Sequence, residues 1–178
     1  MLKLILILVV LAIGTVLVLA ALKPDTFKVQ RSLVIAAPAE KIYPLIDRLS
    51  DQARWQPYYH KDPAMKVNYS GPEAGPGAQV EFSGNNQVGS GRITITGHEE
   101  PGKVSMRLEM LKPFAADNQI EFTLVPKDQG TEVIWSMQGR TPYPAKIIHV
   151  LFNMDKMVGG DFETGLAKLK TIVEGAPT

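Results

Sequence analysis

The histidine–carboxylate pairs of this 178-residue chain that could perform acid–base chemistry lie in two short segments. His60 lies two residues before Asp62, and His98 is followed directly by Glu99 and Glu100. An imidazole beside a carboxylate can transfer a proton near neutral pH. Both segments are polar and separate apolar runs, so we interpret them as solvated turns. The sequence therefore predicts no catalytic residue.

Metal binding and nucleophilic catalysis have little support in the sequence. The chain has no cysteine, and its three histidines lie in separate segments, without the spacing of a metal site. Gly89-Ser90-Gly91 lacks the Gly-x-Ser-x-Gly spacing of a nucleophile elbow. A net charge of +1 provides no basic stripe for nucleic acid. We predict no metal, no cofactor and no nucleic-acid partner.

Binding of an apolar molecule is the chemistry that the side chains favour. Met106, Trp135 and Met137 share the apolar side of alternating segments. A thioether adapts to irregular ligands, and an indole can stack on a ring or donate its N–H. The predicted ligand-binding residues are Trp55, Tyr58, Phe82, Met106, Leu108, Trp135, Met137, Phe162 and Leu166. The same residue types also form ordinary cores, so a packed interior is the alternative interpretation.

These side chains have to be positioned by a sheet and a long helix. Residues 27–35 alternate apolar and polar, as in a half-buried strand, and residues 37–55 have the spacing of two helices. Six further alternating runs lie at residues 65–70, 79–82, 92–96, 104–110, 119–124 and 132–137. Apolar residues three and four apart from Leu151 to Val173 predict a closing helix. Gly159-Gly160 would bend or split it, or would allow close packing of its backbone against a neighbouring element.

The order strand, two helices, six strands and long helix predicts an α+β fold. A seven-stranded antiparallel sheet of this kind has one wet and one dry face. The last helix is the only element long enough to cover the dry face, and a curved sheet around it would leave a space for a ligand. Arg92 and Arg107 fall on the polar side of their strands, so we expect no ionisable residue on the dry face.

A long apolar segment precedes this domain. Leu4 to Leu22 contains no charged residue and would span about 29 Å as a helix, close to the hydrocarbon thickness of a bilayer. We predict a transmembrane anchor at residues 1–22, contacting the membrane through residues 4–22, a linker at 23–26 and a domain at 27–175. A cleaved signal peptide is the alternative, but its apolar region is usually shorter, about 7–15 residues.

Five segments of the chain carry a resemblance to a known family: Ile35-Ala-Ala-Pro-Ala-Glu40, Trp55-Gln-Pro-Tyr58 with Lys61-Asp-Pro63, Val67-Asn-Tyr-Ser-Gly-Pro72, Gly89-Ser-Gly91, and the tail from Met154 to Lys170. They resemble the START-like, or SRPBCC, superfamily, which includes polyketide cyclases and the major pollen allergens. More narrowly, they are similar to membrane-tethered bacterial polyketide cyclase-like proteins. The resemblance implies a helix-grip fold and a single-pass protein of a bacterial-type inner membrane. It does not decide on which side of that membrane the soluble domain lies.

Two departures from the superfamily's patterns limit the functions that this chain can share with its relatives. The iron-dependent oxygenase relatives need two histidines and a carboxylate at one iron, which the three separate histidines do not provide. Tyr58 stands where the resemblance leads us to expect a second tryptophan, which changes the shape of the pocket or adds a hydroxyl.

Three functions are consistent with these observations. The leading hypothesis is a membrane-anchored binding or carrier domain for a hydrophobic small molecule such as a lipid, an isoprenoid or a polyaromatic compound. The alternative is a cyclase- or aromatase-like enzyme, in which a residue such as Tyr58 or Tyr69 would move a proton. A structural or interaction domain without a ligand is the further alternative. Under the leading hypothesis, polar substitutions at Met106 or Trp135 should lower ligand affinity more than stability.

Overall fold

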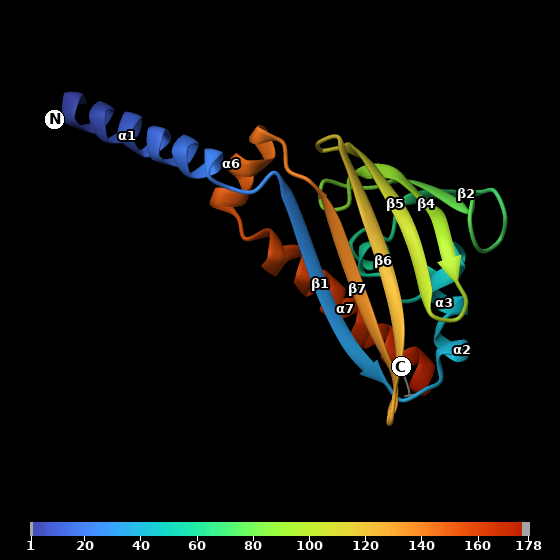
Figure 1. Cartoon of the computed structure of the whole chain (residues 1–178). Helices are drawn as coiled ribbons and strands as arrows, with labels where there is room; N and C mark the ends of the chain where they lie inside the picture. The colour runs from blue at the N-terminus through green and yellow to red at the C-terminus, as the bar shows by residue number, and fades with distance from the viewer. Residues whose placement is uncertain (1, 176–178) are drawn as a thin grey trace.

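The computed structural model describes residues 2–175 apart from the side chain of Met154, so Met1 of the predicted anchor lies outside the described residues. Within residues 2–175, one antiparallel sheet of seven strands has the order β1-β7-β6-β5-β4-β3-β2 (Figure 1). The strands are β1 (Thr26–Ile35), β2 (Lys66–Ser70), β3 (Gln79–Ser83), β4 (Ser90–Glu99), β5 (Lys103–Lys112), β6 (Ala116–Lys127) and β7 (Gly130–Arg140). The helices are α1 (Leu2–Ala21), α2 (Ala39–Ile42), α3 (Pro44–Asp47), α4 (Leu49–Gln52), α5 (Pro57–Lys61), α6 (Tyr143–Leu151) and α7 (Met154–Glu174). The predicted helix-grip fold is confirmed.

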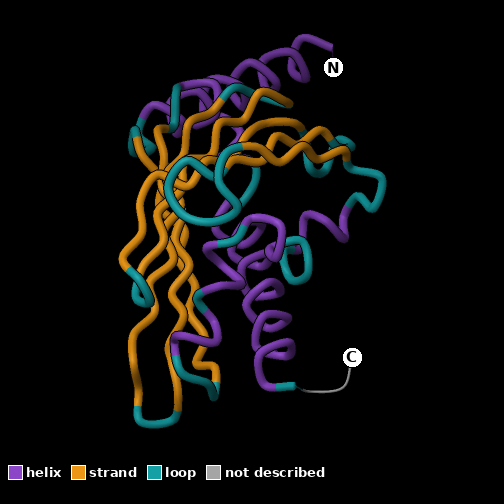
Figure 2. Tube along the Cα trace, turned by 90° about the vertical axis from the view of Figure 1, so that its right-hand side faces the viewer, coloured by secondary structure: helices purple, strands orange, loops and turns teal. Residues whose placement is uncertain are grey.

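The connectivity of the sheet follows from its short turns. Strands β2 to β7 are neighbours in sequence and in space, because a short turn joins antiparallel strands without a crossover. β1 pairs instead with β7, from Thr26 opposite Arg140 to Ile35 opposite Thr131. β1 and β2 are therefore the two edges, and the sheet curves over one side of the helices (Figure 2).

The alternating pattern gives the sheet an inner face, which lies toward α7, and an outer face. In β7, Val133, Trp135 and Met137 are buried on the inner face. Trp135 stacks on Phe162 of α7, so α7 covers this part of the sheet. Gln138 is exposed on the outer face. Burial of the apolar set is the main force that holds helix and sheet together.

Short helices connect β1 to β2. Within residues 37–55 the structure has three of them, α2, α3 and α4, where we predicted two, and α5 follows. Pro44 begins α3 and Pro57 begins α5, because proline lacks an N–H and is accommodated in the first turn of a helix but not in its interior. Ile42 and Ile46 are fully buried and anchor this segment to the core.

The closing helix is not split where the sequence suggested. α7 runs without interruption from Met154 to Glu174, so the expected split at Gly159-Gly160 was wrong. The break lies earlier, at Asn153, whose side-chain oxygen accepts from the backbone N–H of Lys156 at 3.0 Å and caps α7. Gly159 serves close packing instead, because a Cβ there would collide with the guanidinium of Arg31.

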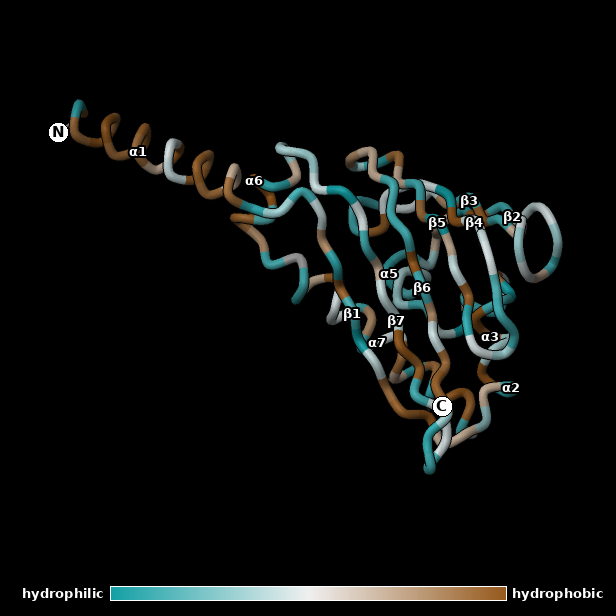
Figure 3. The backbone as a smooth tube through the Cα atoms, viewed as in Figure 1, coloured by the Kyte–Doolittle hydropathy of each residue, from teal (hydrophilic) through white to brown (hydrophobic). Residues whose placement is uncertain are grey.

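Helix α1 projects from the domain and is apolar over most of its length (Figure 3). It is long and apolar enough to cross a membrane, and a signal sequence at this position would have the same length and composition. Ala20 is its buried residue, and it lies in the last turn of the helix.

Candidate ligand-binding site

Four aromatic side chains fill the space between the sheet and α7. Phe162 stacks on Trp135 with ring centroids 4.0 Å apart, and Trp55 meets Trp135 edge-on at 5.6 Å. Phe122 lies 5.0 Å from Trp135 and 5.8 Å from Trp55. The Trp55 N–H donates to the carbonyl of Leu45 at 2.9 Å, which fixes the indole. Such edge and offset contacts add to the stability gained from burial.

This aromatic cluster divides the predicted ligand-binding residues into two sets. Six are buried in the core: Trp55, Met106, Trp135, Met137, Phe162 and Leu166. Three are half-buried: Tyr58, Phe82 and Leu108. The structure thus brings the first set together as a packed interior and leaves the second accessible. A ligand-binding role for either set stays a prediction.

The half-buried residues belong to two apolar rows that cross β2 to β5 on the inner face. The first row is Val67, Phe82, Gly91 and Met110, and the second is Tyr69, Val80, Ile93 and Leu108. Val67 and Tyr69 are 38% and 42% exposed, although they lie on the face that is buried farther along the sheet. We call these residues the apolar rows. Val67 and Tyr69, at the β2 end of the rows, remain as exposed apolar surface, whereas Val80 is buried in the core.

An unpartnered polar atom lies at the inner end of the second row. Among the described residues, four buried side-chain atoms have no hydrogen-bond partner, namely the Tyr43 hydroxyl, Asn118 Oδ1, Trp135 Nε1 and Thr141 Oγ1, and of these Asn118 lies next to the rows. Asn118 lies opposite Leu108 on one side and Gly139 on the other, so it extends the second row. A Cβ at Gly139 would collide with the Asn118 amide oxygen, so this glycine provides the room for the amide. A buried polar atom usually has a partner, and a bound molecule could supply one here.

Tyrosine hydroxyls border the rows on the side of α5. The hydroxyls of Tyr59 and Tyr69 are 3.1 Å apart. Burial, followed by the hydrogen bond to Tyr69, raises the pKa of Tyr59. Burial and the nearby charge of Asp161 likewise raise the pKa of Tyr58. Both phenols therefore remain protonated near neutral pH, where they can act as hydrogen-bond donors.

The histidine–carboxylate pairs suggested by the sequence do not form. His60 Nε2 lies 2.7 Å from the amine of Lys168, while Asp62 accepts from the backbone N–H of Asn85 at 2.6 Å. His98 Nδ1 instead lies 3.3 Å from Asp47 of α3. The buried Asp47 had no sequence signal, because its partner lies 51 positions away. None of these groups touches the apolar rows in the described contacts.

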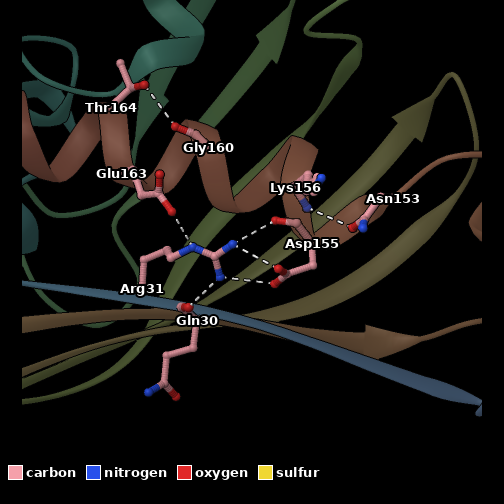
Figure 4. A network of polar contacts seen from close by, with 8 residues as sticks. All are labelled: Gln30, Arg31, Asn153, Asp155, Lys156, Gly160, Glu163 and Thr164. Atoms are coloured by element: carbon pink, nitrogen blue, oxygen red, sulfur yellow. Dashed lines mark hydrogen bonds and ion pairs between the residues drawn. The ribbon is translucent and has the colours of Figure 1, made fainter.

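Arg31 is an ionisable residue on the inner face, where we predicted none. Its η nitrogens contact the Asp155 carboxylate at 3.0 and 3.1 Å, and its Nε donates to Glu163 at 2.6 Å (Figure 4). These charge-assisted bonds join β1 to α7. Arg31 shares the parity of Val29 and Leu33, and that signal could have revealed its direction. It ties the helix to the sheet edge and lies away from the apolar rows.

We expect Asp155→Asn to remove part of the acid sensitivity of folding. The Arg31 guanidinium lowers the pKa of Asp155 in the folded protein. A lowered pKa contributes stability above the unfolded value of about 4, and the contribution is lost as the pH falls through the folded pKa. Urea denaturation should show the variant to be less stable at neutral pH, with the difference shrinking in acid. Asp128→Asn in the β6–β7 turn is the control, and equal pH profiles for the two variants would contradict this linkage.

A hollow of about 510 Å³ lies over β2 to β5. Its lining includes Val67, Phe82 and Gly91 of the first apolar row, and also the ion pair between Arg92 and Glu109, whose atoms are 3.0 Å apart. The predicted outward direction of Arg92 is confirmed, as is that of Arg107, which pairs with Asp117. The hollow thus combines residues of the first row with charged side chains at neighbouring positions.

Comparison with known families identifies the domain. Residues 26–174 match the family described as polyketide cyclase / dehydrase and lipid transport. The chain belongs to this family. The predicted membership in the START-like superfamily is thereby confirmed. No curated protein matches the chain. Within residues 2–175, no group of three histidine, aspartate or glutamate side chains is placed to hold a metal ion.

Several solved structures share this fold at low sequence identity. A solution structure from Thermobifida fusca is 20% identical, with a TM-score of 0.62, over 83% of this chain and 93% of that one. Protein CV1439 from Chromobacterium violaceum is 16% identical, with a TM-score of 0.58, over 88% of this chain and all of its own. DynU16, from the dynemicin biosynthetic locus, is 13% identical, with a TM-score of 0.58, over 85% of this chain and 48% of its own.

Proposed function

We propose that this protein is a membrane-anchored domain that binds a hydrophobic small molecule, such as a lipid, an isoprenoid or a polyaromatic compound, on its apolar rows. The observation that carries the proposal is the exposure of Val67 and Tyr69 on the face that is otherwise the core side of the sheet. Membership in a family that includes lipid transport supports it.

The rows have the composition of a small-molecule site. Such sites are mostly apolar and contain a few placed polar groups that orient the ligand. Here the Tyr59–Tyr69 pair borders the rows, and Asn118 lies at their inner end. Affinity would come from apolar burial, at about 25 cal/mol per Å² removed from water.

The placement of the rows agrees with a ligand taken from a bilayer. Met110 of the first row pairs with Ala116, the first residue of β6, so this row is close to the β5–β6 turn. The start of β6 lies beside the end of β7, which in turn lies beside the start of β1. The β5–β6 turn is therefore at the end of the sheet to which α1 is attached. An anchor at residues 1–22 would therefore hold the rows near the membrane, where apolar ligands are concentrated.

Analysis of co-purifying molecules tests the proposal. Residues 23–178 would be produced in a bacterial host and compared by native and denaturing mass spectrometry. We expect a lipid, quinone or other apolar molecule at a stoichiometric level, and binding of an apolar fluorescent probe after its removal. A protein that carries no molecule and binds no such probe would refute ligand binding and favour an interaction role.

A cyclase or aromatase is the second candidate, and the Tyr59–Tyr69 pair is the observation in its favour. Two phenol hydroxyls beside an apolar surface could polarise a ligand carbonyl or supply a proton. Turnover of a polyketide chain that is abolished in Tyr69→Phe, with binding retained, would separate this function from simple binding.

A further inference from the structure

Helix α6 is attached to the last turns of α1 rather than only to the domain. The Tyr143 hydroxyl donates to the carbonyl of Leu17 at 2.9 Å. The Lys146 amine, which is buried, contacts the Asp25 carboxylate just after α1 at 2.5 Å. Ala20 is completely buried at this junction. These contacts fix α6 beside the end of the apolar segment.

The contact with Leu17 determines how deep in a bilayer α6 would lie. Leu17 lies inside the uncharged run from Leu4 to Leu22, and it is four residues from the end of α1 at Ala21. At about 1.5 Å per residue, a contact at Leu17 is only about 6 Å inside that end. If α1 spans a bilayer, the start of α6 must therefore lie at the boundary between head groups and acyl chains.

The exposed surface of α6 has the composition of that boundary. Leu151 ends the helix and is 62% exposed, and the following Phe152 is 57% exposed. Tyr143, at the other end, is also exposed, and tyrosine is enriched at membrane interfaces. The one lysine of α6, Lys146, turns away from this surface toward Asp25. Large exposed apolar side chains beside a membrane span need a partner, and the bilayer is adjacent.

Cationic side chains lie next to the apolar surface of α6. Lys23 and Lys28 line a groove of about 510 Å³ together with Leu151, Phe152 and Asp155, whose carboxylate is paired with Arg31. Ammonium groups at this level would lie opposite lipid phosphates, while the apolar side chains would reach the acyl chains. The same edge of the molecule thus complements both layers of a bilayer surface.

We propose that α6 is an interfacial helix that lies in the head-group layer of the bilayer, with Leu151 and Phe152 inserted toward the acyl chains. The inference rests on the part of the proposed function in which α1 remains as a membrane anchor. It adds a second membrane contact, which fixes the orientation of the domain relative to the bilayer instead of leaving it on a free tether.

The cysteine-free chain permits a direct test with single labels. Leu151→Cys and Phe152→Cys would each carry an environment-sensitive fluorophore in the full chain, reconstituted in vesicles of phosphatidylethanolamine and phosphatidylglycerol. Both side chains are exposed, so the labels should not disturb folding. Asp128→Cys in the exposed β6–β7 turn is the aqueous control, and Leu8→Cys reports insertion of α1.

We expect nitroxide-labelled lipids to quench the labels at 151 and 152, and iodide to quench them several-fold less than the label at 128. Equal iodide quenching at 151, 152 and 128, with the label at 8 quenched by lipid, would overturn the interfacial role of α6 alone. A label at 8 that iodide quenches freely would overturn the anchor itself. Binding of an apolar probe to the same samples tests the ligand proposal separately.

Discussion

Replacement of Trp135 with alanine is expected to lower the free energy of unfolding by about 3–5 kcal/mol, the usual cost of deleting a large buried aromatic side chain. Trp135 is 1% exposed and is the central ring of the aromatic cluster, in contact with Trp55, Phe122 and Phe162. Alanine would leave a cavity between β7 and α7 that these three rings cannot fill without moving. Urea denaturation followed by circular dichroism measures the loss.

Ser136→Ala is the matched control for this substitution. Ser136 follows Trp135 on the same strand but lies on the outer face, so its truncation should change stability little. The sequence alone suggested that changes at Trp135 would affect ligand affinity more than stability. If Trp135→Ala keeps near-normal stability and loses only ligand binding, the packing interpretation is wrong and the ring belongs to a pocket wall.

Introduction of a carboxylate at Val67 is expected to reduce the affinity for an apolar probe by about tenfold or more, because burial of a valine side chain contributes about 1.5–3 kcal/mol and a desolvated charge opposes binding. Val67 is the exposed end of the first apolar row and pairs with Phe82. Val67→Asp should leave the fold intact, since it removes little packing from the free protein. Fluorescence titration with the probe gives the dissociation constant.

Asn68→Asp provides the control on the neighbouring residue. It adds the same carboxylate to the same edge strand, but Asn68 pairs with Glu81 on the outer face. We expect it to bind the probe like the unmodified protein. Equal losses for Val67→Asp and Asn68→Asp would indicate a general charge effect and would contradict a site on the apolar rows.

The sequence was sufficient to predict the order of the strands and the fold. Alternation with a period of two assigns each strand side chain to a face, and short turns between such runs leave little choice of neighbour. The same rule assigns Arg31 to the inner face, against the prediction that this face has no ionisable residue. The helix break was also misplaced, because it lies at Asn153, and the absence of a side chain at Gly159 lets the Arg31 guanidinium approach α7 closely.

The candidate site was only partly accessible to sequence analysis. Periodicity identified the inner-face residues and assigned Trp135 and Leu108 to the same face. It does not indicate which of the two is covered by α7. Coverage depends on where α7 crosses the curved sheet, and that is decided by packing between residues far apart in the chain. The stacking of Phe162 on Trp135 and the exposure of Val67 are consequences of that crossing.

The sequence by itself determined the family, the sheet and the apolar N-terminal helix, because these follow from local periodicity, turn chemistry and length. The tertiary structure decided which apolar residues form the core and which remain as surface, and it placed α6 beside Leu17. Burial and close approach are properties of three-dimensional packing, so no pattern along the chain specifies them.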